Sequence, residues 1–230
     1  VVIENRPGAA GRIATDLVVK SPPDGYTFLV GTPGSVVLGP MLYASLPYDP
    51  KTDLVPVSLI STTAYALVTH AAVPAADAKS YVALTRTRPE FANVATLGVG
   101  STQHLTCEWF NLVTNAQVRP VHYNTSNPYA DLVAGQMPAV FEALLPLAGS
   151  VRQGRLKVLA ITGRQRWPQL PDVPTFAEAG MPDFRASSWL AVAIRSGTPK
   201  EALDKLGQSI NATMNDPEVR QRLLSMGIEP

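Results

Sequence analysis

The chain has 230 residues, of which 46% are hydrophobic, so it can bury one large core or two smaller ones. Its net charge of +1 gives no electrostatic reason to expect nucleic-acid binding, and its single cysteine excludes an internal disulfide. No apolar run approaches the roughly 18 residues of a membrane span, and the start on Val1, without an initiator methionine, indicates a mature or truncated chain.

The first part of the chain predicts strands divided by loops and helices. Residues 26–31 (YTFLVG) have a continuous apolar centre, which is typical of a buried parallel strand. Residues 40–56 are rich in Pro, Tyr and Asp and lack periodicity, so we expect a loop with short turns there. Further strands are expected at residues 1–3, 57–60 and 64–68, and helices at residues 11–20 and 77–86.

Residues 94–113 predict a strand, a tight turn and a helix. The apolar run 94–97 is stopped by Gly98 and Gly100, and Ser101 then opens a segment with helical periodicity. The apolar residues of this segment recur at the i, i+4, i+7, i+8 spacing of a buried stripe, formed by Leu105, Trp109, Leu112 and Val113. This stripe places Cys107 about half a turn of the helical wheel away from the core, as an unreactive thiol.

Strands and helices alternate in the second half of the chain, which predicts a parallel sheet covered by helices on both faces. Strands are expected at residues 118–123, 139–141, 156–161 and 189–194, and helices at residues 127–135 and 146–153. Two later helices begin at Thr198-Pro199 and at Asp216-Pro217, each with a capping residue followed by proline. Leu203, Leu206 and Ile210 are the expected buried face of the first of them.

Two short polar segments, 61–63 and 186–188, lack apolar anchors and are predicted crossings between two lobes. Residues 1–63 with 187–230 then form the first lobe, and residues 64–186 form the second. Such crossings act as hinges that absorb the dihedral changes of closure around a ligand.

Polar side chains gather where the predicted strands end, which is where open α/β folds bind ligands. The first turn of the helix that follows Ser101 has unpaired N–H groups and a partial positive charge, so it suits an anion. The candidate ligand-binding residues are Gly31, Thr32, Gly100, Ser101, Thr102, Gln103, His104, Tyr123, Asn124, Thr125, Glu142 and Trp189.

Several of the polar residues at these strand ends have a structural alternative. His104 can hold its own loop as a first-turn residue, and the hydroxyl and amide side chains, among them those of Ser101, Ser126 and Asn127, can be simple helix caps. Glu142 can pair with an amino group of a ligand or be a solvated loop charge. Trp189 can be a wall of the ligand site or part of the core.

Other site classes fit the residues poorly, and we expect no cofactor and no metal. A dinucleotide fingerprint would need a third glycine where Gln103 stands and an acidic residue between Val118 and Tyr123, and neither is present. His104, Cys107 and Glu108 lack a second cluster of metal ligands. The remaining enzyme alternative is a hydrolytic enzyme with an α/β fold, acting on an acyl or phosphate ester through the Ser101 loop, although the nucleophile-elbow sequence is missing.

Ordered motifs cover essentially the whole chain. They are residues 5–11 (NRPGAAG), 23–27 (PDGYT), 48–50 (YDP), 98–105 (GVGSTQHL), 171–175 (PDVPT), 178–180 (EAG) and 197–199 (GTP). In this order they resemble the Bug receptors, the periplasmic solute-binding proteins of tripartite tricarboxylate transporters.

This resemblance implies a two-lobed α/β fold of the type II periplasmic-binding-protein class, each lobe a parallel-rich sheet flanked by helices. It implies a non-catalytic, monomeric receptor in the bacterial periplasm that captures a small carboxylate, such as a di- or tricarboxylate, an aromatic acid or an amino acid. The implied partners are the membrane permease subunits of a tripartite tricarboxylate transporter or a sensor protein. Family members carry a glycine-rich ligand loop before the position of Val1, so weak binding by this chain alone is expected.

Overall fold

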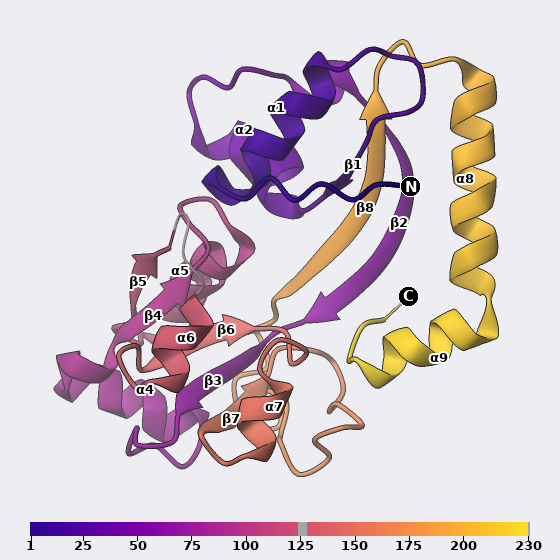
Figure 1. Cartoon of the computed structure of the whole chain (residues 1–230). Coiled ribbons are helices and arrows are strands. Elements are labelled where there is room, and N and C mark those ends of the chain that lie inside the picture. Colours follow the sequence, from indigo (N-terminus) through magenta and orange to yellow (C-terminus); the bar gives the residue numbers. More distant parts are fainter. Residues whose placement is uncertain (124–127, 230) are drawn as a thin grey trace. The chain divides into compact units, whose positions relative to one another are not determined.

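The computed structural model describes residues 1–123 and 128–229. The chain divides into two compact units, which Figure 1 shows in the colours of the sequence. The first unit contains Val1–Thr62 and Ser188–Pro230, and the second contains Thr63–Ser187. Each unit is built around its own sheet.

The first unit contains a three-stranded sheet in the order β1-β8-β2. These strands are β1 (Phe28–Gly31), β8 (Ser187–Arg195) and β2 (Leu54–Ala64). β1 runs antiparallel to β8, with Phe28 opposite Ile194. The predicted parallel strand at residues 26–31 is therefore wrong in its direction. Its partner comes from the far end of the chain, and an apolar run carries no information about the direction in which that partner returns.

Short helices pack on one side of this sheet. A 3-10 turn (Ala9–Gly11) leads into α1 (Arg12–Lys20), and a π turn (Gly34–Leu38) leads into α2 (Gly39–Leu42) and later α3 (Pro50–Asp53). The core of the unit is formed by Val18, Leu29 and Leu54.

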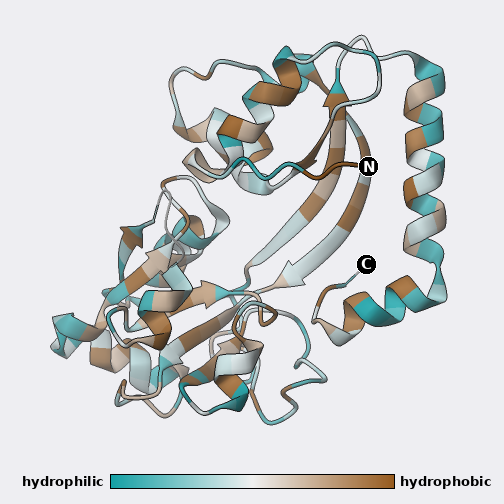
Figure 2. Cartoon of the chain, in the orientation of Figure 1, coloured by the Kyte–Doolittle hydropathy of each residue, from teal (hydrophilic) through white to brown (hydrophobic). Residues whose placement is uncertain are grey.

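Figure 2 shows hydrophobic and hydrophilic residues alternating along α8 (Lys200–Asn215). The expected buried face of α8 is only half-buried, since no residue of this helix is fully buried.

The starts of α8 and α9 (Pro217–Ser225) differ in how they are capped. The Asp216 carboxylate accepts hydrogen bonds from the Glu218 and Val219 N–H groups, which confirms the predicted cap of α9. Thr198 does not cap α8, because its hydroxyl donates to the Arg195 carbonyl at 2.7 Å and Pro199 is the N-cap residue.

One other sequence expectation fails in the first unit. Residues 1–3 form no strand, because their side chains are exposed and no ladder partner pairs with them within the described chain. The segment 61–63, a predicted crossing, belongs to β2, and Thr62 exchanges backbone hydrogen bonds with Glu229. The unit boundary at Thr62–Thr63 thus lies within a strand.

The second unit contains a five-stranded sheet in the order β5-β4-β6-β3-β7. β4 is parallel to both β5 and β6, whereas β3 is antiparallel to both β6 and β7. Four strands therefore run in one direction, and only β3 is reversed, so the sheet is mixed although mostly parallel. The strands are β3 (Ala66–His70), β4 (Asn93–Thr96), β5 (Arg119–His122), β6 (Ala139–Glu142) and β7 (Leu156–Ile161).

Helices cover both faces of this sheet, as the alternation of strands and helices predicted. Neighbouring residues of β6 point to opposite faces, with Phe141 in one hydrophobic cluster and Val140 in the other. The Phe141 cluster packs against α4 (Ala78–Thr87) and α5 (Thr102–Thr114). The Val140 cluster packs against α6 (Pro128–Val133) and α7 (Ala148–Arg152). A separate 3-10 turn (Pro89–Phe91) lies just before β4.

Helix α5 buries a different stripe from the one expected. Trp109 and Leu112 are 42% and 76% exposed, whereas Cys107 and Phe110 are fully buried. The buried residues Gln103, Thr106, Cys107 and Phe110 also follow the i, i+3, i+4, i+7 spacing. Two of them are polar, so hydropathy alone selects the wrong face. Burial also raises the pKa of the Cys107 thiol, which keeps it protonated and unreactive.

Within the part of the chain that the structure describes, no helix combines the length and the apolar character that a membrane crossing requires.

Candidate functional site

The candidate anion site lies at the turn between β4 and α5. Gly98 and Gly100 have φ values of 109° and 82°, a region that glycine adopts without the steric cost of a side chain. Ser101 is the N-cap of α5, and its hydroxyl accepts a hydrogen bond from the His104 N–H at 3.2 Å. The capping alternative is therefore correct for Ser101, whose side chain is nearly buried.

His104 holds this turn through its imidazole ring. Its Nδ1 accepts a hydrogen bond from the Gly100 N–H at 3.2 Å, which requires that nitrogen to be unprotonated. The ring also meets the His122 ring edge-on, with 4.9 Å between the centroids. Burial and the neighbouring His122 lower the pKa of His104, although Glu108 opposes this shift. The neutral ring that the turn needs is thus favoured, as expected for a residue that holds its loop.

Glu142 ends the central strand β6 and is only 6% exposed. Its Oε2 accepts hydrogen bonds from Gln103 Nε2 at 3.2 Å and from the Tyr129 hydroxyl at 2.5 Å, and its Oε1 accepts one from the Ala143 N–H at 2.7 Å. Burial raises the pKa of Glu142 despite these three hydrogen bonds. The solvated-loop interpretation of Glu142 is wrong, because its side chain is buried and hydrogen-bonded to Gln103 in the first turn of α5.

Tyr123 follows β5, and its hydroxyl donates to the Asp131 carboxylate in α6 at 2.7 Å. Burial and this hydrogen bond raise the pKa of Tyr123 to about 12. Asn124 and Thr125, together with the candidate caps Ser126 and Asn127, lie outside the described residues.

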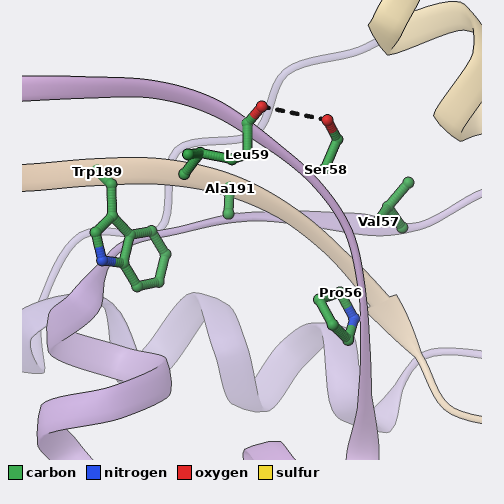
Figure 3. Close-up of a pocket in the computed structure, with 6 residues that line it drawn as sticks. All are labelled: Pro56, Val57, Ser58, Leu59, Trp189 and Ala191. Carbon is green, nitrogen blue, oxygen red and sulfur yellow. Dashed lines mark hydrogen bonds between the residues drawn. The ribbon is translucent and has the colours of Figure 1, made fainter.

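The other candidates belong to the first unit. Gly31 ends β1 and is buried, and Thr32 follows it, with its carbonyl accepting a hydrogen bond from the Ser35 N–H. Trp189 is half-buried and is not among the residues of the hydrophobic clusters. It lines an open hollow of about 520 Å³, shown in Figure 3, with Pro56, Val57, Ser58, Leu59 and Ala191.

Three side chains around the α5 turn were not expected from the sequence. Tyr129 contacts Glu142, His122 contacts His104, and Asp131 contacts Tyr123. His122 lies near the end of a predicted strand, and it could have been selected as Tyr123 was, because open α/β folds bind ligands where their strands end. Tyr129 and Asp131 lie within a helix and carry no such signal.

The contacts of Ser101 and His104 differ from those of a hydrolytic pair. The Ser101 hydroxyl accepts the His104 N–H and His104 Nδ1 accepts the Gly100 N–H, so neither contact is the hydroxyl-to-imidazole hydrogen bond of an activated nucleophile. Outside residues 124–127 and 230, no three His, Cys, Asp or Glu side chains gather as metal ligands.

Comparisons with known proteins agree on one family. The sequence model of the tripartite tricarboxylate transporter family receptor matches residues 1–230. Protein BugT of Bordetella pertussis is 35% identical over 232 residues, which cover 100% of this chain and 71% of BugT.

Solved structures give the same result. Rpa4515 of R. palustris, solved with adipate, is 34% identical with a TM-score of 0.94, over 100% of this chain and 77% of that one. MatC from Rhodopseudomonas palustris, with bound malate, is 29% identical with a TM-score of 0.88, over 96% of this chain and 76% of that one. The periplasmic binding protein BugD is 28% identical with a TM-score of 0.91, over 100% of this chain and 77% of that one.

These matches confirm the resemblance that the ordered motifs indicated, and they confirm the α/β fold of periplasmic binding proteins. They also identify a family of receptors rather than of enzymes, so the hydrolase alternative is not supported. The chain therefore belongs to the tripartite tricarboxylate transporter receptor family and is a periplasmic solute-binding protein of bacteria.

Proposed function

We propose that this receptor captures a small dicarboxylate and holds one of its carboxylates at the first turn of α5. Two of the similar structures contain such acids, adipate in Rpa4515 and malate in MatC. In this chain the supporting observation is that the Thr102 hydroxyl has no hydrogen-bond partner among the described residues, although it begins α5.

The backbone of this turn supports the same proposal. The first intrahelical hydrogen bond is donated by the Leu105 N–H to the Ser101 carbonyl at 3.2 Å, and the His104 N–H is used by the Ser101 side chain. The N–H groups of Thr102 and Gln103 come earlier in the first turn of α5, where a helix offers its N–H groups no intrahelical acceptor. Together with the helix dipole, they offer an anion two donors beside the Thr102 hydroxyl.

We also propose that the two compact units are the two lobes of the receptor, with Gly31, Thr32 and Trp189 as ligand-binding candidates in the first. The loaded receptor would deliver its acid to the membrane permease subunits of a tripartite tricarboxylate transporter. Delivery to a sensor protein is the alternative, and growth on the bound acid after deletion of the permease genes separates the two roles.

Thr102→Val is expected to weaken the binding of adipate or malate at least several-fold, because a charge-assisted hydrogen bond contributes about 1.5 to 3 kcal/mol. Valine keeps the shape of threonine and removes only the hydroxyl. Isothermal titration calorimetry measures the change in Kd.

The matched control is Thr213→Val, which makes the same change on the exposed face of α8. Its Kd should equal that of the unaltered protein. Circular dichroism should show both variants folded, since Ser101 rather than Thr102 caps α5. An unchanged Kd for folded Thr102→Val, where the unaltered protein binds the acid, would remove Thr102 from the site.

A further inference from the structure

The buried carboxylate of Glu142 is surrounded by neutral groups. Its three hydrogen-bond donors are the Gln103 amide from α5, the Tyr129 hydroxyl from α6 and the Ala143 N–H that follows β6. The titratable group in direct contact is Tyr129, and Tyr65 lies behind it close enough to raise the pKa of Tyr129. Among the described residues, no Lys, Arg or His forms an ion pair with Glu142.

This charge lies beside the same helix end that would hold the ligand. Gln103 is the second residue of α5, and its side chain reaches Glu142 in one hydrogen bond of 3.2 Å. The positive end of a helix stabilises an anion within its first turn, so it already stabilises the ionised Glu142. A ligand carboxylate at Thr102 would bring a second negative charge to the same end of α5.

Two negative charges near the same helix end repel each other even when water and protein dipoles screen them. For an ionised Glu142, this repulsion weakens the binding of a ligand carboxylate on the order of tenfold. The three hydrogen bonds of Glu142 lessen the repulsion without removing the charge.

We propose that Glu142 is a specificity-determining residue of the α5 site: its buried carboxylate limits how much negative charge the site accepts, and neutralising it strengthens dicarboxylate binding. This inference rests on the proposed function, because it needs a ligand carboxylate at the first turn of α5. The direction of the pKa shift agrees with it, since burial favours the protonated form of Glu142 at a higher pH than for an exposed carboxyl group.

The test is calorimetric titration with adipate and with malate across a series of pH values. Glu142→Gln removes the charge and keeps the size of the side chain, and it should bind both acids on the order of tenfold more tightly at the upper end of the pH series, where Glu142 is ionised. Asp172→Asn removes the same charge from an exposed turn and should leave the Kd unchanged. As the pH falls, the affinities of the unaltered protein and of Glu142→Gln should converge, because Glu142 becomes protonated.

Tyr129→Phe is the second variant, and it tests the role of Glu142 even if Glu142→Gln does not fold. It removes one donor from the ionised carboxylate, so the pH at which affinity increases should move upward relative to the unaltered protein. Equal affinity in Glu142→Gln, or an unmoved pH profile in Tyr129→Phe, overturns the role of Glu142 while binding itself remains. Absence of binding by the unaltered protein overturns the proposed function and this inference together.

Discussion

Phe110→Ala is expected to lower the free energy of unfolding by about 3 to 5 kcal/mol, the usual cost of removing a buried aromatic ring. Phe110 is fully buried in α5 and is one of four phenylalanines whose rings pack together. Its ring centroid lies 5.3 Å from that of Phe141, 5.8 Å from that of Phe176 and 5.1 Å from that of Phe184, each in an edge-to-face arrangement. Truncation leaves a cavity between these rings and removes three favourable contacts.

Trp109→Ala is the control, because it truncates the neighbouring residue of the same helix. Trp109 is 42% exposed, so its loss should cost less than about 1 kcal/mol. Urea unfolding followed by circular dichroism measures both variants. A greater loss for Trp109→Ala than for Phe110→Ala would show that the apolar stripe expected from the sequence, and not the observed one, faces the core.

Gly25→Ala is expected to lower the free energy of unfolding by about 2 to 5 kcal/mol, as the sum of a backbone and a steric cost. Gly25 has a φ of +86°, and a Cβ built there would lie 2.7 Å from the Ala202 Cβ of α8. Neither group can move aside without shifting the turn before β1 or the helix. The turn therefore accepts only glycine.

Two further variants separate these costs. Ala202→Gly in the Gly25→Ala background removes the steric clash and should recover at most that part of the loss, because the positive φ remains strained and glycine costs up to about 1 kcal/mol relative to alanine in a helix. Gly149→Ala lies in α7, where a Cβ would meet nothing within 4 Å, and should stabilise the protein by about 0.4 to 1 kcal/mol. Full recovery in the double variant would contradict the backbone part of the argument.

The residues themselves determine the local elements of this protein. Asp216 caps α9 by accepting hydrogen bonds from the Glu218 and Val219 N–H groups, and Asp77 caps α4 by exchanging hydrogen bonds with Ser80. The Gly98 to Ser101 turn and the start of α5 also depend on neighbours within one helical turn. Such contacts can be predicted from the sequence because both partners are only a few positions apart. The motifs that indicated the family are likewise short contiguous segments.

Only the tertiary structure decided the direction of β1, the buried face of α5 and the environment of Glu142. The partner of β1 is β8, more than one hundred and fifty positions later, and one hydrogen bond joins Gln103 to Glu142 across 39 positions. Phe110 faces inward because Phe141, Phe176 and Phe184 come together from separate segments, although the helix carries equally apolar residues on its outer side. A periodic pattern shows that a helix has an apolar side, but the surfaces that the rest of the chain presents determine which side is buried.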